Sequence, residues 1–505
     1  MMETTISRDV LVLGAGPAGI DAAQALAESG CNPLVIARGE VDAPESVKVL
    51  SNAVLSEFAG VAGDFRASIT RNSETVQQTF GAVVVAPEYV PQPLNDKYNI
   101  GLSDRVITQT TLEEMLGTSR GRQELAGKNG STIAFVTGFG QEGSPDATRR
   151  VLESALAVQA LEKCSAYIYA GNVKVAGQGL ERLFTKGRHN GVVCIKPGEM
   201  PEITHQDNVL KIVAKDPVLR DAVELAPDFI VVEEAVKPGL SELDQADLLR
   251  IDTDLEGFLP SNNVHRFPAK SNREGIFVAN TAAEAANAVL GVKAFIGSGV
   301  KLVAEEKATV DENRCVICLT CYRCCPHGAI FWENGAAVIS PIACQGCGIC
   351  ASECPMDAIQ IGEFKDDDLK KEVKEAVGAA TEGPSIVAFC CRNSALEAGL
   401  AGSAFGMPFP GGFRMVEVPC AGKVEVEFIM NALVQGADGV MVAACHEGNC
   451  KAERGNIYAK WRVAEIRKRL EAMGLDPERV AFVTVASNMA DDFQKKATRF
   501  AEKLT

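Results

Sequence analysis

The stretch Cys315-Val-Ile-Cys318-Leu-Thr-Cys321-Tyr-Arg-Cys324-Cys325-Pro326 has a counterpart in Cys344-Gln-Gly-Cys347-Gly-Ile-Cys350-Ala-Ser-Glu-Cys354-Pro355. In both stretches, three cysteines at every third position are followed by a fourth cysteine and a proline. This spacing lets three thiolates bind one [4Fe–4S] cluster while the fourth thiolate crosses over to a second cluster. The proline ends any local helix and turns the chain back across the cluster. The tandem motif therefore predicts two [4Fe–4S] clusters.

The crossover gives each predicted cluster four ligands. One cluster is predicted to bind Cys315, Cys318, Cys321 and Cys354, and the other Cys344, Cys347, Cys350 and Cys325. Cys324 is left over and is expected to lie beside a cluster without binding it. Zinc ribbons use cysteine pairs with longer gaps, and disulfides need an oxidising compartment. Both alternatives fit this spacing less well than iron–sulfur clusters do.

Length and charge limit the class of protein. The chain has 505 residues and a net charge of −16, so we expect about two to four domains and no nucleic-acid binding. The N-terminus lacks the basic start and apolar run of a signal peptide. The longest apolar region, 285–303, contains Asn287, Lys293 and Lys301 and falls short of a membrane span. We therefore expect a cytoplasmic protein without direct membrane insertion, for which any attachment to a membrane would need a partner.

A dinucleotide-binding pattern lies near the N-terminus, where a strand-like run enters Gly14-Ala-Gly16-Pro17-Ala18-Gly19 and a helix-like run follows. Gly14 permits the tight turn, Gly16 lets a diphosphate approach the backbone, and Gly19 lets the helix pack on the strand. The helix start, which includes Pro17 and Ala18, would present unpaired N–H groups to the diphosphate. This context predicts a Rossmann-type FAD- or NAD(P)-binding region.

The next strand ends without the carboxylate that usually binds ribose hydroxyls. Ala37 stands at that place and Arg38 follows it. Arg38 either faces a phosphate of the cofactor or is a solvated surface residue. Two interpretations therefore stay open, a retained dinucleotide and a Rossmann core kept only as a scaffold.

The remaining pattern predicts an α/β multidomain protein. Core strands are predicted at 81–86, 131–138, 166–170, 228–233 and 275–279, with helices at 146–162 and 283–295, and short strands of a crossing layer at 191–196 and 209–214. This alternation indicates two nested dinucleotide-type units within a first domain at 1–304. A bacterial-type ferredoxin domain is predicted at 305–364 and a parallel α/β domain at 384–505. An exposed helix, capped by its aspartates, is expected from Lys365 onward.

The C-terminal domain has cysteines at the ends of three predicted strands. The strand 385–389 ends in Cys390 and Cys391, the strand 415–418 precedes Cys420, and the strand 439–444 ends in Cys445, with Cys450 shortly after. Parallel strands would gather these thiols at one sheet edge, where α/β sheets bind ligands. One of Cys390 and Cys391, together with Cys420, Cys445 and Cys450, would suit an iron–sulfur cluster. Zinc could use the same four thiolates.

The order of these parts resembles two known families. Residues 1–300 with the cluster motif resemble the A subunit of heterodisulfide reductase, a flavoprotein with a thioredoxin-reductase-like fold. Residues 384–505 resemble the delta subunit of methyl-viologen-reducing hydrogenase through Phe389-Cys-Cys391, Pro419-Cys-Ala-Gly-Lys423 and Ala437-Asp-Gly-Val-Met-Val-Ala-Ala-Cys-His-Glu-Gly-Asn-Cys450. In that family the domain carries a [2Fe–2S] cluster. Fusions of the two modules are similar to the B subunit of quinone-interacting oxidoreductase complexes.

Four features depart from these families. The region 135–152 contains no cysteine where the A subunit carries a cysteine-rich insert. The flavin-contact motif reads Phe277-Val-Ala-Asn280-Thr281 instead of the usual glycine followed by a small or acidic residue. Ser394 stands where the delta subunit often has another cysteine. An extra N-terminal domain of many A subunits also has no counterpart in this sequence.

The resemblance implies an electron-transfer subunit of an anaerobic oxidoreductase that carries FAD, two [4Fe–4S] clusters and one [2Fe–2S] cluster. No catalytic acid or base is needed in this chain. The implied partners are heterodisulfide-reductase-like B and C subunits, a hydrogenase or formate dehydrogenase, or a quinone-linked membrane subunit. Two alternatives remain, a flavin-free electron wire and assembly scaffold, and an NAD(P)H-dependent oxidoreductase in which Arg38 binds a phosphate.

Overall fold

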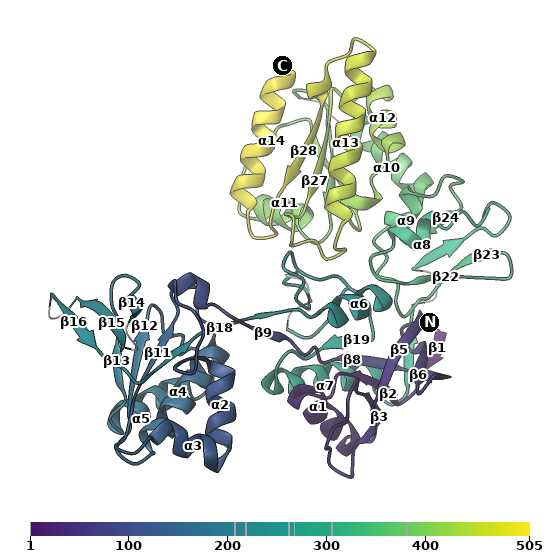
Figure 1. Cartoon of the computed structure of the whole chain (residues 1–505). Coiled ribbons are helices and arrows are strands. Elements are labelled where there is room, and N and C mark those ends of the chain that lie inside the picture. Colours follow the sequence, from purple (N-terminus) through teal and green to yellow (C-terminus); the bar gives the residue numbers. More distant parts are fainter. Residues whose placement is uncertain are drawn as a thin grey trace. The chain divides into compact units, whose positions relative to one another are not determined.

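The computed structural model describes residues 2–206, 209–217, 220–260, 263–266, 268–304, 307–379 and 382–505, with the backbone alone at 240–243 (Figure 1). The chain forms two compact units. One unit joins Met1–Glu88 to Leu240–Thr505, and the other is Tyr89–Gly239. The predicted domain borders at 304, 364 and 384 stay predictions.

The first Rossmann-type sheet has five parallel strands in the order β19-β8-β2-β3-β4. The strands are β2 (Asp9–Leu13), β3 (Asn32–Ile36), β4 (Lys48–Leu50), β8 (Ala82–Val85) and β19 (Ile276–Val278). Their central residues are almost continuously apolar because helices and a second layer cover both faces. Helices α1 (Pro17–Glu28) and α7 (Ala282–Ile296) pack side by side.

Smaller elements complete this part of the first unit. They are β1 (Met2–Thr5) paired with β20 (Val300–Val303), the antiparallel sheet β5 (Ala53–Val61), β6 (Asp64–Arg71) and β7 (Glu74–Phe80), and helix α6 (Leu240–Leu249). Leu55, Phe65 and Ile69 of the antiparallel sheet join the core of the parallel sheet.

The second unit repeats the parallel plan with the order β10-β17-β11-β12-β13. Its strands are β10 (Val106–Thr108), β11 (Thr132–Thr137), β12 (Ser165–Ala170), β13 (Val193–Ile195) and β17 (Phe229–Val232). Its helices are α2 (Gln109–Gly117), α3 (Ser119–Ala126), α4 (Pro145–Gln159) and α5 (Leu180–His189), and η1 is a short turn (Asn95–Tyr98). The predicted α/β fold is confirmed in both units.

An antiparallel layer of β14 (Glu202–Gln206), β15 (Val209–Asp216) and β16 (Asp221–Leu225) packs on this second sheet, and β9 (Val90–Pro93) pairs with β18 (Glu234–Lys237). The strand predicted at 209–214 therefore lies in a separate layer as expected. The expectation for 191–196 was wrong, because β13 pairs in parallel with β12 and extends the main sheet. Helix α5 makes the crossover that parallel pairing requires.

The ferredoxin module consists of two short antiparallel pairs and two short helices. The pairs are β21 (Ala308–Val310) with β24 (Ile359–Ile361) and β22 (Ile330–Glu333) with β23 (Ala336–Ile339), and the helices are α8 (Thr320–Cys324) and α9 (Ile349–Ser352). Helix α10 (Asp366–Gly378) follows. Each short helix begins within a cysteine motif and ends before its proline, because proline cannot continue a helix.

The C-terminal domain is a four-stranded parallel sheet in the order β26-β25-β27-β28. The strands are β25 (Ile386–Cys391), β26 (Phe413–Val418), β27 (Gly439–Ala444) and β28 (Val480–Thr484). One face is covered by α11 (Ala395–Ala404) and α14 (Ala490–Leu504), and the other by α10, α12 (Val426–Val434) and α13 (Gly455–Ala472), with short turns η2 (Ala421–Lys423) and η3 (Pro477–Arg479) (Figure 1).

The ferredoxin module and the C-terminal domain share one hydrophobic core. Ile349, Cys350 and Ile359 of the module pack in the same cluster of buried residues as Phe389 and Val416 of the parallel sheet. A shared core fixes the two parts against each other far more firmly than a flexible linker does. The cysteine motifs of both parts are therefore held in a defined relation.

Candidate metal centres and nucleotide site

The first group of thiols joins both ferredoxin motifs. It consists of Cys315 and Cys318 in the loop before α8, Cys321 within α8, and Cys354 after α9. The four side chains line one small cavity whose other walls are apolar. Burial, followed by the charges of Cys354, Cys318 and Cys315, raises the pKa of Cys321. The fold thus places Cys354 of the second motif beside the three cysteines of the first.

The second group of thiols takes one cysteine from the first motif and three from the second. It consists of Cys325 after α8, Cys344 and Cys347 before α9, and Cys350 within α9. Burial and the charge of Cys325 raise the pKa of Cys347, and Cys344 and Cys450 add to the rise. The backbone N–H groups of Ala329 and Gly346 donate hydrogen bonds to the sulfurs of Cys325 (3.5 Å) and Cys344 (3.4 Å). Such bonds stabilise negative sulfur and tune the potential of a bound cluster.

The third group of thiols lies at the carboxyl edge of the C-terminal sheet. The Sγ atoms of Cys391 and Cys445 are 3.6 Å apart, and those of Cys420 and Cys450 are 3.9 Å apart. Hydrogen bonds from the thiols of Cys391 and Cys450 lower the pKa of Cys445, whereas hydrogen bonding with Cys391 and Cys450 and burial raise the pKa of Cys420. Of these neighbouring thiols, Cys445 is therefore the one stabilised as a thiolate, the form in which cysteine binds metal.

Two cysteines stand outside these three groups. Cys390 points to the opposite face of the sheet, where it packs among Ile386 and Ala388 beneath α11 and α14. Neighbouring residues of a strand face opposite sides, so only one of the pair Cys390 and Cys391 can join the other thiols. Cys324 is half-buried next to the second group, and burial raises its pKa to about 12.

The donor sets fit iron–sulfur clusters. All twelve side chains of the three groups are thiols, the ligands that both cubane and two-iron clusters prefer. Tetrahedral metal–thiolate geometry places two sulfurs about 3.8 Å apart, close to the two pair distances at the C-terminal edge. Among the residues that the structure describes, no three His, Cys, Asp or Glu side chains are placed to hold a single metal ion. In a cubane each thiolate binds a different iron, so its ligands stand further apart. The ligand roles themselves stay predictions.

A loop that the sequence patterns did not single out contacts the third group. The side-chain amide of Asn263 donates hydrogen bonds to the carbonyl of Cys450 (2.7 Å) and to Glu453 (2.8 Å). Arg266 pairs with Glu453 at 2.7 Å, and both side chains are less than one tenth exposed. Polar residues in a loop carry no periodic signal, so nothing in the sequence alone marks this contact.

A buried ion pair was also missed. Lys423, three residues after Cys420, has a side chain with no exposed surface and pairs with Asp366 and Glu425. The expectation that the aspartates after Lys365 cap an exposed helix was wrong for Asp366, because its side chain is buried against Lys423. Helix α10 has Lys365 at its N-cap position and no side-chain capping bond.

The glycine turn keeps the backbone shape of a dinucleotide site. Gly14 has a φ of +104°, and a Cβ at this position would lie 1.9 Å from the carbonyl oxygen of Ala86. A Cβ at Gly19 would lie 2.1 Å from the carbonyl oxygen of Gly14. Only glycine fits either position. Helix α1 begins at Pro17, with Ala18 in its first turn, and no side chain caps its start.

The charge of the turn does not fit a diphosphate. The Glu88 carboxylate accepts a hydrogen bond from the N–H of Ala15 at 3.2 Å, at the place where a diphosphate oxygen would accept it. The adjoining cavity of about 460 Å³ is lined by Arg38 but also by Glu40, Glu88 and Asp244. Ala37 offers no carboxylate to ribose hydroxyls. The predicted FAD therefore stays a prediction that the side chains of this turn oppose.

Two parts of the chain match known families. Residues 337–360 match the 4Fe-4S binding domain family, and residues 386–505 match the family of the methyl-viologen-reducing hydrogenase delta subunit. The chain is 40% identical to the iron–sulfur D subunit of an F420-non-reducing hydrogenase of Methanopyrus kandleri over 22% of this chain and 86% of the relative. For the corresponding protein of Archaeoglobus profundus, identity is 36% over 23% of this chain and 85% of the relative.

Longer relatives match most of the chain. The A subunit of the ferredoxin:CoB-CoM heterodisulfide reductase of Methanosarcina mazei is 26% identical over 85% of this chain, and the chain spans 58% of that relative's length. Among solved structures, a thioredoxin reductase of T. acidophilum matches 57% of this chain and 99% of its own at 13% identity and a TM-score of 0.35. A NAD-dependent persulfide reductase of A. fulgidus matches 95% of this chain and 99% of its own chain, at 13% identity and a TM-score of 0.35.

No helix within the described ranges has the length and apolarity that a bilayer crossing needs. The chain is similar to the A subunit of heterodisulfide reductase over most of its length, and through residues 386–505 it belongs to the family of methyl-viologen-reducing hydrogenase delta subunits.

Proposed function

We propose that this chain is an electron-transfer subunit of a multi-subunit anaerobic oxidoreductase. The observation that carries the proposal is the succession of three thiol groups on one shared core. Cys321 and Cys354 belong to the first group, Cys347 to the second and Cys450 to the third. The second and third groups are neighbours, since the charge of Cys450 contributes to the raised pKa of Cys347. Bound iron–sulfur clusters would supply one-electron redox chemistry at these places. The polypeptide's own task is to hold the ligands, bury them and fix their spacing.

The cluster types are part of the proposal. Two [4Fe–4S] clusters are supported by the ferredoxin spacing and by the gathering of Cys354 with the first motif. A [2Fe–2S] cluster is supported by the two close thiol pairs at the C-terminal edge. Zinc also prefers four thiolates in a tetrahedron, but among the described residues no three His, Cys, Asp or Glu side chains are placed to hold one ion, so the two-iron cluster is the proposal and metal analysis tests it.

The relatives are named as subunits of heterodisulfide reductase and of hydrogenases, which supports redox partner subunits for this chain. We propose that electrons enter and leave through cytoplasmic heterodisulfide-reductase-like B and C subunits, a hydrogenase or formate dehydrogenase, or a quinone-linked membrane subunit. The chain would belong to an oxidoreductase whose substrate chemistry is completed by these other chains. The similarity to two kinds of redox-complex subunit in one polypeptide supports this assignment.

Anaerobic purification of the intact chain with its native partners tests the function. We expect about ten iron atoms per chain, from two cubanes and one two-iron cluster. Reduction of the complex by its electron donor should bleach the cluster absorption and produce electron paramagnetic resonance (EPR) signals of both cluster types. Stoichiometric zinc in place of iron, or clusters that do not respond to any purified partner, would contradict the proposal.

A second candidate function is a flavin-free electron wire and assembly scaffold. The Glu88 carboxylate at the N–H of Ala15 favours it, because this carboxylate competes with the diphosphate of FAD. Flavin released by acid precipitation decides between the two candidates. About one flavin per chain supports the flavoprotein, and its absence from an iron-replete preparation supports the wire.

A further inference from the structure

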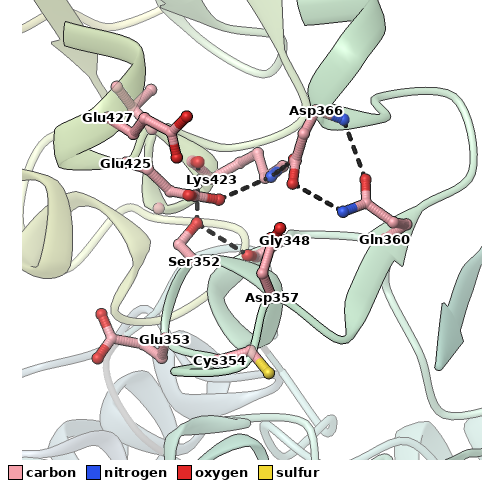
Figure 2. A network of polar contacts seen from close by, with 12 residues as sticks. Gly348, Ser352, Glu353, Cys354, Asp357, Gln360, Asp366, Lys423, Glu425 and Glu427 are labelled. Atoms are coloured by element: carbon pink, nitrogen blue, oxygen red, sulfur yellow. Dashed lines mark hydrogen bonds and ion pairs between the residues drawn. The ribbon is translucent and has the colours of Figure 1, made fainter. Parts of the chain in front are cut away.

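A fully buried lysine stands between the second and third groups of thiols. Lys423 lies in η2, three residues after Cys420, and its side chain has no exposed surface. Its Nζ atom pairs with Asp366 and lies 3.0 Å from a Glu425 carboxylate oxygen. The same atom is 4.9 Å from the centroid of the Phe428 ring. Figure 2 shows the ammonium enclosed between the two carboxylates.

The pair is held in place from the ferredoxin side. The other carboxylate oxygen of Asp366 accepts a hydrogen bond from the amide of Gln360 at 2.7 Å, and the Asp366 N–H donates to the same side chain at 3.0 Å (Figure 2). Burial alone would raise the pKa of Asp366, but the hydrogen bonds from Lys423 and Gln360 lower it below its usual value. Asp366 is therefore the preferred counter-ion of Lys423.

The same lysine touches the segment that carries the second group. Gly348, between Cys347 and Cys350, has a φ of +83°, and a Cβ there would lie 2.8 Å from the Cβ of Lys423. The Ser352 hydroxyl at the end of α9 donates to the Lys423 carbonyl oxygen at 2.8 Å (Figure 2). The ligand-bearing segments of two thiol groups are thus in direct contact at Lys423.

A second cation reinforces this contact. Arg462 of α13 donates to the carbonyl oxygens of Gly422 (2.8 Å) and Val424 (2.9 Å) and pairs with Glu353. A Cβ at Gly422 would lie 2.7 Å from Cγ1 of Ile349. The segments η2 and α9 therefore approach as closely as their backbones allow.

We propose that the Lys423–Asp366 pair sets the reduction potentials of the second [4Fe–4S] cluster and the C-terminal cluster together. This inference rests on the proposed function and names two residues that regulate it. Adding one electron to a cluster adds one negative charge and breaks no bond. A buried charge nearby changes the free energy of that step strongly, because little water screens it.

The two residues act with opposite signs. Lys423 favours the added electron on either side of it, and Asp366 opposes it. Loss of the lysine charge leaves Asp366 and Glu425 without a cation, so both potentials become more negative. Loss of the aspartate charge leaves Lys423 with Glu425 alone, so both potentials become less negative. A role in packing alone predicts no such reversal of sign.

The test is a redox titration of the full-length, cluster-loaded protein followed by EPR spectroscopy. The variants are Lys423→Met, which keeps the length of the side chain, and Asp366→Asn, which keeps its shape. The matched control is Lys371→Met, which removes an exposed lysine–glutamate pair within α10. Both midpoint potentials are expected to fall in Lys423→Met, rise in Asp366→Asn and shift least in Lys371→Met.

Shifts of one sign in both variants, or shifts no larger than the control's, would overturn the inference while leaving the proposed function intact. If the Lys423→Met protein does not accumulate, the potentials of Asp366→Asn alone test the inference. That variant removes one charge and leaves Glu425 paired with Lys423. A wild-type protein that binds no clusters at these cysteines would instead refute the proposed function. The two failures are therefore distinguishable.

Discussion

The sulfur of Cys391 lies 3.6 Å from the sulfur of Cys445, although 54 positions separate them in the sequence. Cys391 is the last residue of β25 and Cys445 directly follows the neighbouring parallel strand β27, so the sheet itself brings them to one edge. Cys390 precedes Cys391 directly and faces the opposite side of the sheet. The pleat of one strand thus separates a candidate ligand from an apolar core residue.

We therefore predict opposite outcomes for Cys391→Ser and Cys390→Ser. Cys391→Ser should lose the EPR signal of the C-terminal cluster and about two iron atoms per chain, because a two-iron cluster loses one of its four thiolates. Cys390→Ser should keep both. Cys390→Ser should lower the free energy of unfolding by roughly 1–3 kcal/mol, because it buries a hydroxyl in an apolar core. Iron analysis and denaturation curves measure the two effects, and iron loss only in Cys390→Ser would reverse the assignment.

The crossover gives a second prediction, on the ferredoxin module. Cys354→Ser should alter the same cluster as Cys315→Ser, since Cys354 lies with Cys315 around one cavity. Cys325→Ser should alter the same cluster as Cys344→Ser. EPR spectra of the four variants should therefore fall into two pairs. Spectra that pair by position in the sequence, Cys354 with Cys344, would contradict the crossover. Cys324→Ser is the control and should keep both clusters.

Short-range sequence patterns predicted most of this fold for physical reasons. Alternating strands and helices, the glycine turn at Gly14 and the cysteine spacing are local features, and each follows from residues a few positions apart. Lys423 and Asp366 could not be found in this way, because these partners lie 57 positions apart and charged residues usually signal an exposed surface. The same holds for Arg266 and Glu453, which are 187 positions apart.

A third prediction concerns that buried pair. Arg266→Met leaves the Glu453 carboxylate buried without its cation, which should cost about 3–5 kcal/mol of unfolding free energy. The double variant Arg266→Met with Glu453→Gln should recover part of this loss, because no charge is then left uncompensated. The matched control is Lys460→Met, which removes an exposed pair with Glu447 worth about 0–1 kcal/mol.

Chemical denaturation of the cluster-loaded protein, followed by cluster absorption and by circular dichroism, measures these costs. The nearby Asn263 bonds the carbonyl of Cys450, so loosening of this loop should appear first as faster loss of the C-terminal cluster. Equal destabilisation in Arg266→Met and Lys460→Met would show that burial does not strengthen the Arg266–Glu453 pair.

The last prediction concerns the Glu88 carboxylate at the glycine turn. Glu88→Ala frees the N–H of Ala15 and removes a negative charge from the place of a diphosphate, so added FAD should bind more tightly than to the wild-type chain. Because Glu88 is exposed and water screens its charge, the gain is about 0.5–1 kcal/mol, which corresponds to roughly a twofold to fivefold change in the dissociation constant. Asp244→Asn is the control, since it removes a charge from the same cavity but leaves the Ala15 N–H bonded to Glu88. Fluorescence quenching of added FAD measures all three affinities. An equal affinity of the wild-type and Glu88→Ala chains would show that the Glu88 carboxylate does not compete with the diphosphate. The missing ribose-binding carboxylate at Ala37 would then be the remaining explanation for a protein without flavin.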